Sequence, residues 1–190
     1  MKEIRVTGLR AESPAGQESL TLQGRPIVFE TPTVIHDPAG EYIEIIKRGA
    51  LDNTDLSDVR LLYNHDLSKV PLARTPKTMQ LQKGPAGLEM RALLADTQEA
   101  KAVHEAVKRG DLSGMSFAFT VPQGGDEWDA ATNTRTINQI AKVLECSITP
   151  FPAYPTASVE ARSARQDVIN RNQAKQKAKI LFNQIMKVQV

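Results

Sequence analysis

The sequence contains little of what disulfide-linked, metal-binding and membrane-spanning proteins need. Its single cysteine, Cys146, excludes an intrachain disulfide framework and a multi-cysteine zinc site, and is typical of a reducing cytoplasm. The three histidines are widely separated, so we expect no histidine-rich metal site and no cofactor. No apolar run approaches the roughly 20 residues that cross a bilayer, and the N-terminal residues lack a signal-peptide core. We therefore expect a soluble protein that stays in the compartment where it is made.

Charge is distributed unevenly along the 190 residues, although the net charge is only +2. Residues 161–190 hold seven basic residues and one acidic residue, so they carry +6 and residues 1–160 carry −4. The same segment is rich in Gln, Asn, Lys and Ala, with scattered apolar residues. We predict one folded domain at residues 1–162 and a basic tail at 163–190, either an amphipathic helix or an arm that orders on a partner. Because the tail lacks interleaved aromatic residues, we do not expect nucleic-acid binding.

Apolar residues mostly recur with a period of two, which is typical of β-strands. Proline and glycine predict a turn at residues 11–16 and a loop at residues 31–40. The predicted strands lie at residues 59–64, 88–94, 115–121 and 141–148.

One segment, residues 97–109, has helical periodicity instead. Asp96 can cap this helix, with Glu99 three residues later, and Gly110 suits its left-handed end. The apolar residues at helical spacing are Ala100, Val103 and Val107. The sequence therefore predicts a helix at residues 97–109.

The stretch "GDLSGMSFAF", from Gly110 to Phe119, is the first candidate for chemistry. In an extended strand, Ser116 would lie on a face of small side chains, opposite a face of large apolar ones. Such a face either packs closely against another element or leaves room for a ligand. Ser113 is explained by turn chemistry. Ser116 is either a structural serine or a nucleophile, and a nucleophile needs a base within hydrogen-bond reach.

Histidine is the usual base for a serine nucleophile. His65 ends the predicted strand "VRLLYNHD", where a side chain is both held and accessible, although such a residue also serves turns. His36 falls in the predicted loop, and His104 falls between apolar positions of the helix, where packing explains it. His65 is therefore the preferred base.

A carboxylate, Glu145, lies inside the otherwise apolar strand "KVLECSIT". Burying it without a partner would be costly, so it either orients a catalytic histidine or forms a salt bridge with a neighbouring strand. Strict alternation places Val143, Glu145 and Ser147 on one face. It places the remaining residues on the other face: Leu144, Cys146 and Ile148. Cys146 is therefore expected in the core rather than as a nucleophile.

Several motifs occur together in a fixed order: "RLLYNHD", "PLARTPKTMQL", "GLEMRALLADT", "RGDLSGMSFAF" and "TRTINQIAKVLECSITPFPAYPTASV". Over about residues 22–162 they resemble the tailed-bacteriophage prohead protease family, the serine proteases that mature phage capsids. The sequence departs from the family pattern at "LARTP" and "LECSI", where "LGRT" and "LEVS" are usual, and neither change touches a candidate catalytic side chain.

The resemblance implies an α+β fold related to herpesvirus maturation proteases: a closed, mainly antiparallel β-barrel surrounded by helices. It implies that Ser116 attacks the scissile carbonyl and that His65 accepts its proton and later delivers it to the leaving amine. Glu145 matches the third, carboxylate position, for which Asp66 and Asp111 are alternatives.

The resemblance also implies partners and a location. The major capsid protein and its scaffolding segment would be substrates, and the protease would self-associate and cleave itself inside the assembling prohead in the host cytoplasm, with no membrane. The basic tail would tether it to scaffold or capsid. Gly114 would allow close backbone approach beside the nucleophile, and Arg135 would either stabilise an anion or form a surface salt bridge.

Two other functions compete with the protease. One is a noncatalytic capsid-assembly or scaffold-binding module with the same fold. The presence of Ser116, His65 and Glu145 argues against it, because a binding module has no need of that combination. The other is a cysteine hydrolase that uses Cys146, which the expected position of this residue in the core disfavours.

Overall fold

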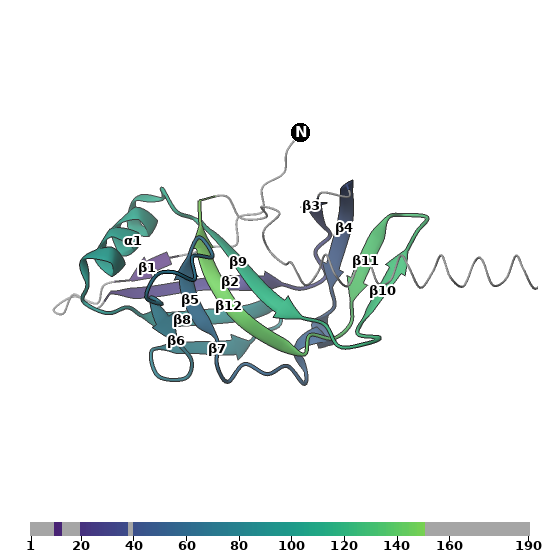
Figure 1. Ribbon diagram of the computed structural model, residues 1–190, viewed down its shortest axis with the longest axis horizontal. Helices are drawn as coiled ribbons and strands as arrows, with labels where there is room; N and C mark the ends of the chain where they lie inside the picture. The colour runs from purple at the N-terminus through teal and green to yellow at the C-terminus, as the bar shows by residue number, and fades with distance from the viewer. Residues whose placement is uncertain (1–9, 13–19, 38–39, 151–190) are drawn as a thin grey trace, which may run out of the picture.

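The computed structural model describes residues 10–12, 20–37 and 40–150, which form three four-stranded sheets, one α-helix and one short 3-10 helix (Figure 1). The predicted basic tail and the boundary at residue 162 lie outside the described residues, as does most of the predicted turn at 11–16. No helix in the described part of the chain is both long and apolar enough to span a membrane.

The sheets are named here in the order of their first strands. The first sheet has the order β1 (Arg10–Glu12), β2 (Thr21–Val28), β8 (Gly87–Leu93) and β7 (Met79–Lys83). The second has the order β10 (Asp126–Asp129), β11 (Thr134–Ile137), β4 (Gly40–Ile46) and β3 (Thr33–Asp37). The third has the order β6 (Ala73–Arg74), β5 (Arg60–Tyr63), β12 (Lys142–Thr149) and β9 (Gly114–Thr120). The helices are η1 (Arg48–Leu51) and α1 (Gln98–Arg109).

The expected closed barrel is wrong. Each of the three sheets has two edge strands among the described residues, and no hydrogen-bonded ladder joins one sheet to another. Strand β9 contacts β2 and crosses it at an angle without pairing to it (Figure 1). Two pairings, β11 with β4 and β12 with β5, are parallel, and α1 is the single α-helix of the described residues rather than one of a surrounding set. Apolar alternation predicts that a segment is a strand, but the choice of neighbouring strand depends on residues far away in sequence.

The predicted loop at residues 31–40 is also wrong, because β3 occupies Thr33–Asp37 and pairs with β4. The prolines and glycine of this stretch flank a strand of a hairpin instead of filling a loop. His36 therefore lies on β3, where its Nδ1 is 2.6 Å from the Glu41 carboxylate on β4.

The predicted helix is confirmed as α1, with its cap one residue later than expected. Thr97 is the N-cap: its backbone is extended, and its hydroxyl accepts a hydrogen bond from the Ala100 amide at 3.2 Å. Asp96 instead forms an ion pair with Lys101. At the other end Gly110 adopts the left-handed φ of 85° and ends the helix as predicted.

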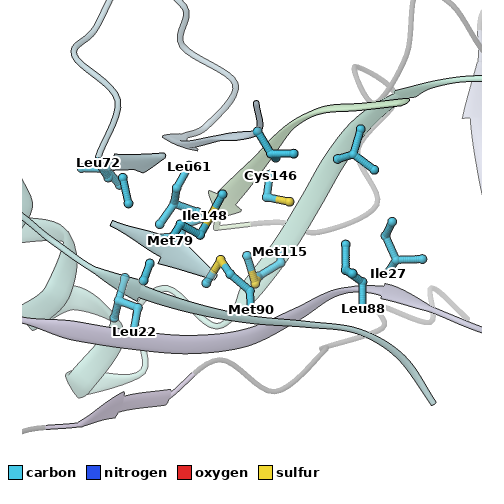
Figure 2. Close-up of a cluster of buried hydrophobic side chains, with 14 of the residues drawn as sticks. Leu22, Ile27, Leu61, Leu72, Met79, Leu88, Met90, Met115, Cys146 and Ile148 are labelled. Carbon is cyan, nitrogen blue, oxygen red and sulfur yellow. The ribbon is translucent and has the colours of Figure 1, made fainter. Parts of the chain in front are cut away.

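The apolar core lies between the first and third sheets and α1 (Figure 2). Strands of the first sheet contribute Leu22, Ile27, Met79, Leu88 and Met90. Strands of the third sheet contribute Leu61, Met115, Cys146 and Ile148. The third sheet thus buries one face in the core and is free to carry polar side chains on the other.

Strand β12 contains a bulge that changes which residues share a face. Val143 pairs with Phe119 and Glu145 pairs with Ala118, so Leu144 is an extra residue on β12. Val143 therefore joins Cys146 in the core, while Leu144 is 37 % exposed. The predicted alternation is wrong for Val143 and Leu144, and correct from Glu145 onward.

In the second sheet, a buried guanidinium lies between two carboxylates. Arg135 on β11 is 0 % exposed, and its Nη1 and Nε lie 3.0 Å from Glu44 and 2.9 Å from Asp126. A surface salt bridge and a role as anion stabiliser at Ser116 are thus both wrong for Arg135, which lies in another sheet. Burial raises the pKa of the Glu44 carboxyl despite the nearby guanidinium.

Arg135→Met is expected to lower the free energy of unfolding by about 3–5 kcal/mol, because it leaves the buried Glu44 and the half-buried Asp126 without a counter-charge. Urea unfolding at neutral pH would measure this change. Because the pKa of Glu44 is raised in the folded state, protonation favours folding, and the deficit should shrink as the pH falls.

The matched control is Arg25→Met, which removes a half-buried arginine paired with Glu89 at 2.6 Å. We expect this control to cost about 0–1 kcal/mol. Equal effects of the two substitutions would contradict the structural importance of the buried group.

Candidate active site

A tight turn after β5 positions His65. Asn64 and His65 have φ values of 52° and 59°, and the Asp66 amide donates to the Tyr63 carbonyl at 3.1 Å. Two successive left-handed residues under such a hydrogen bond are typical of a type I′ turn, and asparagine and histidine are among the residues that tolerate this conformation. The Asn64 amide donates to the carbonyl of Ile148 at 2.9 Å, which fastens the turn to β12.

Glu145 lies on the central strand β12 and contacts His65 directly. Its Oε1 is 2.6 Å from His65 Nδ1, and its Oε2 accepts a hydrogen bond from the Ser147 hydroxyl at 2.5 Å. Its register partner on β5, Arg60, forms an ion pair with Asp58 at 3.3 Å. The buried carboxylate therefore pairs with the histidine rather than with an arginine or lysine of a neighbouring strand.

Ser116 lies on the strand that pairs with β12 along its second edge, opposite to β5. It lies on β9, and its register partner on β12 is Ser147. Directly opposite residues of an antiparallel pair project from the same face, which here is the face of Glu145, away from Cys146. Ser147 also accepts a hydrogen bond from the His65 amide at 3.1 Å, so Ser116, His65 and Glu145 are gathered around it.

The other candidate groups are engaged elsewhere. Asp66 accepts hydrogen bonds from the Ser68 hydroxyl and amide at 2.6 and 2.9 Å, which lower its pKa, and Asp111 forms an ion pair with Arg109. Burial raises the pKa of the Cys146 thiol, as expected for a core cysteine, and keeps it in the unreactive protonated form.

The third histidine of the chain lies on the helix. His104 lies on the inner side of α1 and is 5 % exposed, as its packing role predicts. In the described ranges there is no cluster of three His, Cys, Asp or Glu residues that could hold a metal ion.

Ser147 is a residue of the site that the sequence alone does not single out. Its small hydroxyl two residues after Glu145 was the available signal, but the bonds that it makes depend on the turn at His65, which is far away in sequence. Both serines and the carboxylate are nearly fully buried: Ser116 and Glu145 are 7 % exposed, and Ser147 is 0 % exposed.

An imidazole whose Nδ1 contacts a buried carboxylate can use its other nitrogen, Nε2, as a base, and a serine on the adjoining strand carries a hydroxyl that such a base can activate. This is the side-chain set of the serine hydrolases. Residues 7–172 of the chain match the family described as caudovirus prohead serine protease, and the chain belongs to this family. The match confirms the resemblance and reaches ten residues into the predicted tail. No curated protein and no solved structure matches the chain.

Proposed function

We propose that this chain is the endopeptidase of capsid maturation in its phage, with Ser116, His65 and Glu145 as its catalytic residues. Its substrates are scaffold protein or the scaffolding segment of the major capsid protein. The observation that carries the proposal is the 2.6 Å contact of Glu145 with His65 Nδ1, beside a serine held on the adjoining strand. Family membership supplies the reaction class, peptide-bond hydrolysis.

The proposed reaction has two stages. The Ser116 oxygen attacks the scissile carbonyl carbon while His65 Nε2 takes the hydroxyl proton, and Glu145 stabilises the resulting imidazolium. His65 then gives this proton to the leaving amine as the peptide bond breaks, which leaves an acyl group on Ser116. A water molecule, deprotonated by His65, attacks the acyl carbon, and the released serine oxygen regains the proton.

The position of Ser116 supports an extended peptide as substrate. Strand β9 is an edge strand of the third sheet among the described residues, and Ser116 lies within it. An extended segment can pair with such an edge through main-chain hydrogen bonds, while its side chains alternate between the two faces. Scaffolding segments would be suited to this mode of binding when they are extended.

The proposed location is the assembling prohead in the host cytoplasm, where the protease meets the capsid protein, associates with further copies of itself and cleaves its own chain. The alternative is a noncatalytic assembly or scaffold-binding module. A binding module would have no need to hold a buried carboxylate on an imidazole beside a serine, and this arrangement favours the enzyme.

Coexpression of the full chain with the major capsid protein of the same phage tests the proposal. Intact-mass spectrometry of assembled proheads should show a shortened capsid or scaffold polypeptide and protease chains that have lost terminal residues. The same capsid protein without the protease is the control. Assembled proheads in which every polypeptide keeps its full mass would contradict the protease and support the assembly module.

A further inference from the structure

The Ser147 hydroxyl lies at the centre of the proposed site, although it belongs to none of the three catalytic residues. It is fully buried, it accepts from the His65 amide at 3.1 Å, and it donates to Glu145 Oε2 at 2.5 Å. One side chain on β12 thus joins the backbone of the histidine turn to the carboxylate that contacts the same histidine.

In each of these hydrogen bonds, chemistry determines which group donates and which accepts. A backbone amide can only donate, so the Ser147 oxygen accepts from His65 and its own proton goes to Glu145 Oε2. Ionised carboxylate oxygens only accept, so the second one, Oε1, accepts a hydrogen bond from His65 Nδ1–H. With the proton on Nδ1, Nε2 of the neutral ring is the acceptor nitrogen that a general base requires.

The backbone at His65 adds a second reason for this contact. Its φ of 59° is in the left-handed region, which costs energy for a residue with a side chain and persists where surrounding contacts hold it. The bond from its amide to Ser147 is one such contact, and the Asn64 amide bond to Ile148 is another. Ser147 therefore helps to hold both the ring and the turn that carries it.

We propose that Ser147 is a positioning residue of the active site. It fixes the Glu145 carboxylate so that one oxygen meets His65 Nδ1, and it holds the His65 turn against β12. This inference rests on the proposed catalytic roles of Ser116, His65 and Glu145. Ser147 itself touches neither substrate nor reacting atoms in this scheme.

The test compares two hydroxyl deletions on the same strand. Ser147→Ala removes the bonded hydroxyl, whereas Thr149→Val removes a hydroxyl two residues further along β12. Thr149 is 4 % exposed, and its Oγ1 has no hydrogen-bond partner in the described part of the chain. Ser147→Cys, with a weakly bonding thiol at the same position, is the second variant should Ser147→Ala fail to fold. Melting temperatures establish that each variant is folded.

The kinetic probe is diisopropyl fluorophosphate, which phosphorylates an activated serine and releases fluoride. We expect Ser147→Ala to lower the maximal inactivation rate roughly 10- to 100-fold, the loss seen when the hydrogen-bonded groups that orient metal-ligating histidines are removed, with little change in the probe's binding constant. Thr149→Val should react as the wild-type protein does. A Ser147→Ala protein that is folded and reacts at the wild-type rate would overturn the inference.

A spectroscopic readout separates this inference from the proposed function. In a Ser116→Ala background, which cannot react, the proton NMR resonance of the hydrogen-bonded His65 Nδ1–H should be visible. It should broaden or move upfield on adding Ser147→Ala and persist on adding Thr149→Val. A wild-type protein that fails to react at Ser116 would contradict the proposed function, whereas an unchanged Nδ1–H resonance in the Ser147 variant would contradict the role of Ser147.

Discussion

Ser116→Ala is expected to abolish processing of the capsid protein, with a loss in kcat of about 10⁶, as is typical when the nucleophile of a serine protease is removed. The reason is chemical: alanine has no oxygen to form the acyl intermediate, and His65 has no proton to accept. Because Ser116 is small and the change removes one atom, the fold should be retained. Intact-mass spectrometry of coexpressed proheads would measure the loss.

Cys146→Ala is the matched control on the neighbouring strand. Cys146 is the register partner of Phe117 and faces the core with Met115 and Ile148 (Figure 2). As the next residue along the strand, Glu145 projects from the opposite face of β12. Its replacement should lower stability modestly through lost packing and leave processing intact. Processing that survives Ser116→Ala and disappears with Cys146→Ala would reverse the assignment of the nucleophile.

Glu145→Gln is expected to lower kcat about 10⁴-fold, as replacement of a triad carboxylate by its amide does. In the wild-type protein the carboxylate receives two donors, His65 Nδ1–H and the Ser147 hydroxyl. A glutamine offers one acceptor oxygen and one NH₂ group, so it can satisfy one of these donors. If the NH₂ faces the ring, the proton of His65 moves to Nε2 and the base is lost. If it faces Ser147, the hydroxyl proton of Ser147 loses its acceptor in a buried place.

The controls for this prediction are substitutions of Asp66 and Asp111, the two other acids that lie near the catalytic residues in the sequence. Asp66→Asn and Asp111→Asn should leave kcat near the wild-type value, because these carboxylates bond Ser68 and Arg109. Single-turnover processing of assembled proheads would give the rates. A large loss with Asp66→Asn and a small one with Glu145→Gln would move the third catalytic position to Asp66.

Much of the local structure could be predicted because it depends on neighbours in sequence. The helical spacing around Val103, with Gly110 as its end, predicted α1 to within a residue, and the period-two segments around Leu61 and Phe117 are strands. The N-cap was placed on Asp96 instead of Thr97 because both residues suit the position, and the choice depends on which backbone becomes extended.

Features that depend on distant residues could not be predicted in the same way. Arg135 looks like a surface residue in sequence, and its burial follows from the parallel pairing of β11 with β4, which brings Glu44 beside it. The open sheets in place of a closed barrel have the same origin, since strand order is a property of the whole chain. For the site, the residue types of Ser116, His65 and Glu145 were available from the sequence and the family resemblance, whereas the contacts of Ser147 were not.

The extra residue in β12 has a consequence for how the chain tolerates changes in length. In a regular strand that kept Val143 in the interior, position 145 would turn inward and position 146 outward, so that the molecule would offer a thiol where it now offers a carboxylate. The presence of a residue at position 144, more than its leucine side chain, thus determines whether the Glu145 carboxylate or the Cys146 thiol lies on the face of His65. Substitutions at position 144 should be tolerated because its side chain lies at the surface. Loss or gain of one residue there would instead move the core-facing side chains of the strand to the outer face and the outward-facing ones into the core.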